Sequence, residues 1–258
     1  MPCETLKISE HNDGAVLEIA LNTPPGNVLT AKMMAEIESQ LEIEEKERAR
    51  KLIIFTGAGD HFSFGASVEE HQRDQVGAML PAFHRLMGKV LAHPTPMLAK
   101  VSGQCLGGGF ELALACSFII ASEDARFAVP EISLGVFPPV AALLLPRLVG
   151  PMRANRMVLT GAKSSAEDMH CAGLVIGVSK KGDLDDDTTA FIEKYILPKS
   201  ASSLRFAQRA ARASLMRHYE AHIGELERLY LNELMSSHDA NEGIAAFLEK
   251  RAMEWTNS

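Results

Sequence analysis

The stretch Gly107-Gly108-Gly109-Phe110-Glu111-Leu112 decides how this chain is interpreted. Three consecutive glycines let a backbone turn tightly and present bare N–H groups to a molecule that approaches closely. A helix that begins there directs the positive end of its dipole to the same point. Glu131 follows twenty positions after Glu111, between Pro130 and Ile132. We therefore expect an anion cradle flanked by two carboxylates, which suits acid–base chemistry on a carbonyl or thioester.

Composition excludes several classes of protein. The chain has 258 residues, 47% of them hydrophobic, and a net charge of −7, whereas a nucleic-acid-binding surface is normally basic. No run approaches the roughly 18 apolar residues of a membrane span. The segment Met1–Lys7 shows neither the apolar run expected of a signal peptide nor the Arg-rich pattern expected of a presequence, and the cysteines are scattered without metal-site spacing. We expect a cytoplasmic protein that binds neither nucleic acid nor membrane and holds no metal.

The first part of the chain alternates short apolar strands with helices. Strands are predicted at residues 5–8, 15–21, 52–55, 97–101, 118–121 and 174–178, with one helix from Thr30 to about Arg50 and another over 107–116. Ser165 and Asp168 predict a capping box at the start of a short helix. This alternation predicts an α/β core with parallel strand pairing.

The pattern changes after residue 184. Helices are predicted at 191–195, 203–215, 218–236 and 241–255, and no strand follows. We expect an α/β core at 1–185 that carries the site, and a helical region at 186–258. The apolar positions of that region need a partner surface, which is either the core or another subunit.

A second loop supports the same site. Phe62-Ser63-Phe64-Gly65-Ala66-Ser67 comes after the predicted strand at 52–55. Alone it is simply a loop after a strand. Together with the glycine run it suggests that two strand-end loops converge, so that one N–H from each forms a two-donor oxyanion hole.

Each glutamate also has a structural explanation. Glu111 is a favourable charge near a helix N-terminus, and Glu131 is a plausible exposed turn residue. However, both are bracketed by apolar residues, and burial would raise their pKa values toward the range useful in catalysis. The pair, combined with two glycine-containing loops, favours the catalytic interpretation.

Four segments in order carry a family resemblance over nearly the whole chain. They are Thr23–Leu29, similar to P-x-x-N-x-L; Phe62–Ser67, similar to F-S-x-G-x-D; Gly103–Leu112, similar to G-x-x-x-G-G-G-x-E-L; and Phe127–Gly135, similar to F-x-x-P-E-x-x-L-G. The chain thereby resembles the crotonase (enoyl-CoA hydratase/isomerase) superfamily. The resemblance implies a ClpP/crotonase-like α/β fold of repeated ββα units with a C-terminal helical trimerisation region. It also implies a trimer or dimer of trimers that binds an acyl-CoA thioester, with no cofactor beyond the coenzyme A of the substrate.

The resemblance assigns roles by position. The backbone N–H groups of Ala66 and Gly108 would hold the thioester oxygen, and Glu111 and Glu131 would be the catalytic carboxylates. The presence of both carboxylates favours addition of water over isomerisation. The positions implied in binding the substrate and its CoA are Pro25, Phe64, Gly65, Ser67, Val68, Gly107, Phe137 and Pro139.

The chain departs from the family pattern at three places. Ser67 stands where aspartate is usual, and Glu69 where a lysine is often found near the CoA phosphates. After the second glutamate, the family's hydratases commonly have I-P-G-A-G-G, with a glycine N–H near the water. Here the sequence is Phe137-Pro138-Pro139-Val140-Ala141-Ala142. Because Pro139 has no N–H, the water must be held otherwise in a bulkier, more apolar pocket.

Within the family, Phe64–His71 and the Phe-Pro-Pro loop resemble the cyclohexa-1,5-diene-1-carbonyl-CoA hydratases of anaerobic benzoyl-CoA breakdown. This implies addition of water across a conjugated ring diene to give 6-hydroxycyclohex-1-ene-1-carbonyl-CoA. The alternatives are a straight-chain enoyl-CoA hydratase, or an enoyl-CoA isomerase of fatty-acid-type β-oxidation that uses one glutamate. A non-catalytic, RNA-binding or scaffold member is a further class, against which the acidic balance and the carboxylate pair argue.

Overall fold

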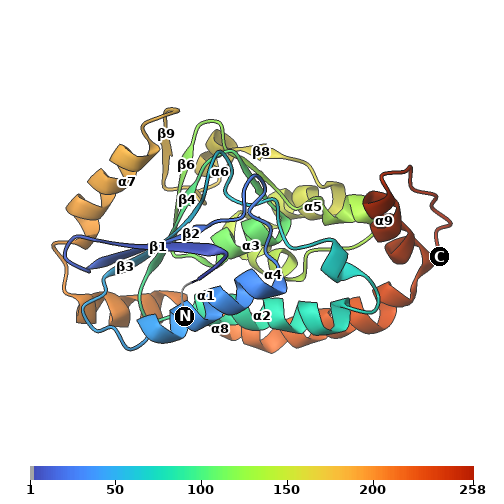
Figure 1. The fold of residues 1–258 in the computed structure, drawn as a ribbon, viewed down its shortest axis with the longest axis horizontal. Helices are drawn as coiled ribbons and strands as arrows, with labels where there is room; N and C mark the ends of the chain where they lie inside the picture. Colours follow the sequence, from blue (N-terminus) through green and yellow to red (C-terminus); the bar gives the residue numbers. More distant parts are fainter. Residues whose placement is uncertain (1–2) are drawn as a thin grey trace.

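The computed structural model describes residues 3–258 (Figure 1). Met1 and Pro2, part of the amino-terminal segment interpreted above, lie outside the described residues. The strands are β1 (Leu6–His11), β2 (Val16–Leu21), β3 (Leu52–Gly57), β4 (Met97–Val101), β5 (Gln104–Leu106), β6 (Phe118–Ser122), β7 (Arg126–Ala128), β8 (Ser164–Ser165) and β9 (Gly177–Ser179). The α-helices are α1 (Ala31–Glu44), α2 (Val76–Ala92), α3 (Gly107–Ala115), α4 (Pro139–Leu148), α5 (Pro151–Thr160), α6 (Ala166–Cys171), α7 (Leu184–Phe191), α8 (Ala201–Arg228) and α9 (His238–Glu249). Short 3₁₀ or π turns are η1 (Glu69–His71), η2 (Pro130–Leu134), η3 (Ile192–Ile196), η4 (Leu229–Glu233) and η5 (Leu234–Ser236).

The main sheet has the strand order β1-β2-β3-β4-β6-β9. All neighbours are parallel except the hairpin of β1 and β2, so the predicted α/β core with parallel pairing is confirmed. Pairs of strands followed by a helix recur as β1-β2-α1 and β4-β5-α3. A smaller sheet has the order β5-β7-β8.

Both faces of the main sheet are buried, and the period of two along each strand separates them. Ile53 and Phe55 of β3 belong to the larger core, under α1, α2, α3 and α4. Leu52 and Ile54 face the other way and pack with Ile192 of η3. Figure 1 shows α7 on the other side of the strands from α1 and α2. This alternation explains why the strands read as continuous apolar runs.

Several predicted boundaries are wrong for identifiable reasons. The strand expected at 174–178 is only Gly177–Ser179, because the N–H groups of Leu174 and Val175 bond to Met169 O and close α6 instead. The capping box at Ser165 is confirmed.

Helix α1 begins after Thr30, whose side chain accepts the N–H of Met33 as expected, but it ends at Glu44 and not near Arg50. The chain turns there because the buried Arg50 folds back, with Nε 2.6 Å from Glu44 Oε2.

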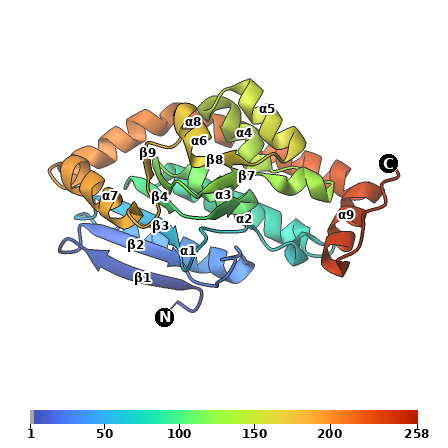
Figure 2. The same cartoon turned by 90° about the horizontal axis from the view of Figure 1, so that it is seen from above.

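The C-terminal region has one long helix where two were expected. Residues 203–215 and 218–236 lie mostly in the continuous α8, which continues into η4, and α9 ends at Glu249 where the prediction extended to 255. Figure 2 shows α8 running along the large helices of the core. Contacts hold it there: the hydroxyl of Tyr219 donates to His84 O of α2 at 2.7 Å, and His84 Nδ1 lies 2.8 Å from Glu227 Oε2.

The small sheet positions both the glycine run that begins α3 and the segment that carries Glu131. Strands β5 and β7 are parallel, with Leu106 opposite Ala128. Gly107 therefore begins α3 at the same sheet edge at which Pro130 begins η2. Because the carboxyl ends of parallel strands share one edge, Glu111 and Glu131 are brought to one side of the molecule.

No helix among residues 3–258 combines the length and the apolar character needed to cross a membrane.

Candidate active site

One cavity of about 400 Å³ collects most of the predicted site residues. Its walls come from the loop after β3, from α2 and α3, from η2 and the start of α4, and from the C-terminal segment after α8. The predicted residues that line it are Phe64, Gly65, Ala66, Val68, Gly107, Gly108, Glu111, Glu131, Phe137 and Pro139. The cavity is of a size typical for small-molecule sites, and its lining is mostly apolar.

Two predicted residues lie outside this cavity. Pro25 is exposed, in the turn that packs beneath Phe64. Ser67 Oγ instead accepts the N–H of Glu70 at 3.4 Å, at the start of η1. Their assignment to the substrate or its CoA stays a prediction.

Hydrogen bonds on both sides of Ala66 fix its position. The N–H of Gly65 donates to Ser63 Oγ at 3.1 Å, and the N–H of Ser67 donates to Leu29 O at 3.2 Å. Asn27 holds the same loop by donating to Ala58 O and to His61 O. Among residues 3–258 the N–H of Ala66 has no acceptor, so it is available to a ligand.

Gly108 lies against Ala66. It is the second residue of α3, where a helix leaves its N–H groups without intrahelical acceptors. A Cβ at Gly108 would lie 3.1 Å from the nitrogen of Ala66 and 3.2 Å from its Cβ. The bare glycine therefore permits a close approach of the two backbones, and both residues line the same cavity.

Glu111 is buried and held by backbone donors. Its side chain is 3% exposed, and Oε1 accepts the N–H of Ala141 at 2.8 Å. Burial raises the pKa of Glu111 to about 7, although hydrogen bonds from Ala141 and Val140 favour the charged form and act in the opposite direction. Both donors belong to the first turn of α4, which carries Pro139.

Glu131 has a different environment. It is half-buried as a residue, but its Oε2 is closed to solvent and has no hydrogen-bond partner within residues 3–258. A Cβ at Gly107 would lie 2.6 Å from Oε1, so this carboxyl group also depends on a bare glycine. Burial, and then the charge of Glu111, raise the pKa of Glu131 well above its usual range. The two carboxyl groups are therefore close enough to influence each other.

The cavity contains polar residues that the sequence did not indicate. Tyr230 of η4 lines it, and so does His71 of η1, whose Nδ1 lies 2.7 Å from Ser67 O. Burial lowers the pKa of His71, which favours the neutral ring. No local motif marks Tyr230, and His71 was named only as the last residue of the Phe64–His71 segment. Tyr230 reaches the cavity only because α8 and η4 dock on the core.

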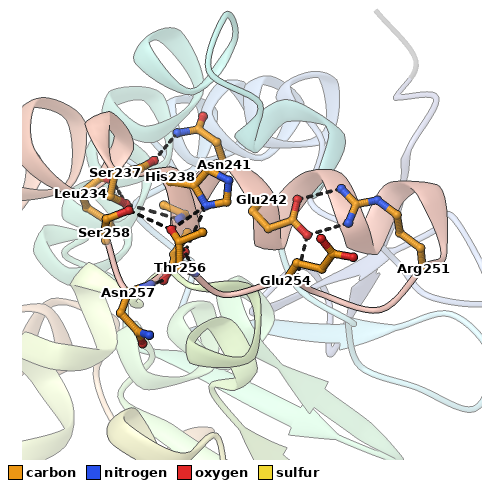
Figure 3. A network of polar contacts seen from close by, with 12 residues as sticks. Leu234, Ser237, His238, Asn241, Glu242, Arg251, Glu254, Thr256, Asn257 and Ser258 are labelled. Carbon is orange, nitrogen blue, oxygen red and sulfur yellow. Dashed lines mark hydrogen bonds and ion pairs between the residues drawn. The ribbon is translucent and has the colours of Figure 1, made fainter.

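The C-terminal tail also contributes to the wall. Met253 lines the cavity, and the tail around it is tied to α9 (Figure 3). Arg251 pairs with Glu242 through Nη1 at 2.5 Å and Nη2 at 2.7 Å. Further along, the N–H groups of Thr256 and Asn257 donate to the two carboxylate oxygens of Asp239.

Comparison with known proteins finds hydratases of the family that the sequence motifs resemble. The family model described as Enoyl-CoA hydratase/isomerase matches residues 11–258. A cyclohexa-1,5-dienecarbonyl-CoA hydratase of Thauera aromatica is 40% identical, over 98% of this chain and 97% of the relative. A probable enoyl-CoA hydratase of Bacillus subtilis is 33% identical, over 93% of this chain and 94% of the relative.

Solved structures agree with the fold. An enoyl-CoA hydratase from Mycobacterium avium subsp. paratuberculosis superposes with a TM-score of 0.87 at 26% identity, covering 99% of this chain and 100% of that one. The α/β fold with a C-terminal helical region is therefore the crotonase-like fold that the motifs implied. The chain belongs to the enoyl-CoA hydratase/isomerase family, that is, to the crotonase superfamily.

Proposed function

We propose that this protein is an acyl-CoA hydratase that adds water to a conjugated enoyl- or dienoyl-CoA thioester. The observation that carries the proposal is the meeting of two buried carboxyl groups and two free backbone N–H groups at one cavity. Hydration of a conjugated thioester needs a base for water, an acid for carbon and donors for the enolate oxygen. The names of the relatives as hydratases support this choice over isomerisation.

The environments of the two glutamates suggest their roles. Glu111 accepts backbone N–H groups that favour its anion, so it takes the proton from water. Glu131 has only its own backbone N–H as such a donor and lies near the charge of Glu111, so it stays protonated and delivers a proton to carbon. A C–O bond forms, the π electrons move toward the thioester oxygen, and the proton of Glu131 completes the addition. The N–H groups of Ala66 and Gly108 stabilise the enolate oxygen, each by about 3 kcal/mol.

The proposed substrate is cyclohexa-1,5-diene-1-carbonyl-CoA, and the product is 6-hydroxycyclohex-1-ene-1-carbonyl-CoA. Its support is the similarity to the Thauera aromatica relative, together with the aromatic residues that line the cavity, among them Phe64, Phe83 and Phe137. Coenzyme A enters as part of the substrate, and no other cofactor is proposed. Assembly as a trimer or dimer of trimers is proposed from the family resemblance, with residues 186–258 packing on the core and on neighbouring subunits.

The test compares substrates with the purified protein in ¹⁸O-labelled water. The cyclic dienoyl thioester should gain one labelled oxygen, with kcat/KM at least about a hundredfold above that of crotonyl-CoA. Equal or faster hydration of crotonyl-CoA would favour a straight-chain hydratase, and a shifted double bond without label would favour an isomerase. No turnover of any of these thioesters would reject the proposal.

A further inference from the structure

The hydroxyl of Tyr230 is a buried polar group without a structural explanation. Tyr230 is 1% exposed, and its hydroxyl has no hydrogen-bond partner among residues 3–258. A buried hydroxyl left unpaired is costly, and buried polar groups in folded proteins are nearly always paired. The ring itself is well accounted for, because it packs edge-on against Phe137 with centroids 5.4 Å apart. A phenylalanine would fill the same space, so the hydroxyl needs another reason.

The position of the hydroxyl suggests that reason. Tyr230 lines the same cavity as Glu111 and Glu131. Burial raises the pKa of Tyr230, and so do the charges of Glu131 and Glu111, which places the phenol within electrostatic reach of both carboxyl groups. At the cavity, Glu131 Oε2 is likewise closed to solvent and unpaired within the described residues. Two residues that line one cavity therefore each carry a polar atom that is closed to solvent and unpaired within the described residues.

Among the described residues, positions 138–141 of the neighbouring wall offer no free backbone N–H to the cavity. Pro138 and Pro139 line the cavity and have no N–H, and the N–H groups that follow, of Val140 and Ala141, are used by Glu111. Glu111 in its basic form only accepts hydrogen bonds. A water oxygen beside these groups would give its proton to Glu111 and would still need a donor to hold its lone pair.

We infer that Tyr230 holds the water that adds to the substrate, by donating its O–H to the water oxygen and afterwards to the new hydroxyl oxygen of the product. This inference rests on the proposed function and deepens it. The water loses a proton to Glu111 while its oxygen bonds to carbon, and Tyr230 keeps its own proton throughout. The C-terminal segment thus supplies a polar group to a reacting centre whose other groups lie between Ala66 and Glu131.

The test is Tyr230→Phe, which removes one oxygen and keeps the ring against Phe137. With the enoyl thioester that the wild type hydrates best, kcat should fall about tenfold or more, while KM changes less than about threefold. The Tm should stay the same or rise, because the lost hydroxyl had no partner. The matched control is Tyr219→Phe. That hydroxyl already donates to His84 O, so Tm should fall while kcat stays near wild type.

A binding experiment separates a water-holding role from a structural one. In a Glu111→Gln background, which stops the reaction, calorimetry compares 6-hydroxycyclohex-1-ene-1-carbonyl-CoA with cyclohex-1-ene-1-carbonyl-CoA. Adding Tyr230→Phe should weaken binding of the hydroxylated thioester about tenfold and leave the other unchanged. Unchanged kcat, or equal weakening of both thioesters, would overturn the inference. A wild-type protein that hydrates nothing would instead defeat the proposed function, whatever the binding data show for Tyr230.

Discussion

Glu111 Oε1 accepts the N–H of Ala141 at 2.8 Å, so the helix that carries Pro139 also stabilises the carboxylate beside the cavity. The contact joins residues thirty positions apart and partly offsets the effect of burial on Glu111. It gives the two glutamates unequal environments, and this inequality underlies the first predictions below.

Replacing either carboxyl group with an amide should remove one proton transfer. Glu111→Gln and Glu131→Gln should each lower kcat at least about a hundredfold, because positioned acids and bases contribute that much. Circular dichroism should show that both variants fold. Glu123→Gln, at a carboxylate outside the cavity, is the control and should keep full activity. Retained turnover in either of the first two variants would remove that glutamate from the mechanism.

Activity should fall on both the acidic and the alkaline side of an optimum pH. Glu111 must be ionised to act as a base, and its pKa is raised to about 7, so kcat/KM should fall as pH drops through that region. Glu131 must be protonated, so activity should fall again at higher pH, where it loses its proton. The apparent values belong to the interacting pair. A profile that is flat from about pH 5 to 8 would contradict the assignment.

The stability contributed by Glu111 should fall as pH rises, whereas kcat/KM should rise over the same range. The pKa of Glu111 rises from its ordinary 4.5 to about 7 on folding, so the folded state binds the proton more tightly. This contribution to the free energy of unfolding is fully present below 4.5, the pKa of Glu111 in the unfolded chain. It is lost as pH rises through the folded pKa of about 7. Glu111→Gln should therefore raise Tm at about pH 8 and change it little near pH 4. Thermal unfolding at both pH values tests this, and equal shifts at both would contradict it.

Gly108 should be far less tolerant of alanine than a matched glycine. A Cβ there would crowd Ala66 at 3.1–3.2 Å, so Gly108→Ala should lower kcat by roughly a hundredfold through displaced donors. Gly77 is also the second residue of its helix, and nothing lies within 4 Å of a Cβ there. Gly77→Ala should keep activity and hold or raise Tm. Steady-state kinetics and melting curves of both variants decide the matter, and equal losses would argue against crowding.

Loosening the C-terminal tail should raise KM more than it lowers kcat. Arg251→Ala removes the pairs to Glu242 and frees the segment that places Met253 in the cavity wall. An apolar contact worth about 1 kcal/mol corresponds to a roughly fivefold rise in KM. Lys181→Ala removes an exposed pair with Asp124 and should change nothing. A large fall in kcat with unchanged KM for Arg251→Ala would contradict this role.

Local signals explain what the sequence predicted well. The glycine run, Glu131 and the loop at Ala66 are short segments in which the chemistry of a few adjacent residues indicates a turn, a helix start or a buried carboxyl group. Likewise, Thr30 and Ser165 predict helix starts because a cap acts within one turn. Such features need no knowledge of distant packing.

Features that depend on docking were missed. Tyr230 lies about a hundred residues beyond Glu131, and its place at the cavity follows from how α8 lies on the core. Helix α2 was not predicted, because Gly77, Pro81 and Gly88 weaken the helical signal of its sequence. Its apolar face is stabilised by contact with α1 and α8, which no local pattern reveals.

The walls of the cavity come from segments as far apart in the chain as Gly65 and Met253. During synthesis the ribosome releases the first of these long before the second. We expect the cavity to stay open to solvent in the nascent chain until the last part of its wall has been made, because Tyr230, Phe247 and Met253 belong to that wall. A chain that stops before them would leave the substrate site in contact with water, and would be a poor catalyst even with its strands already in place.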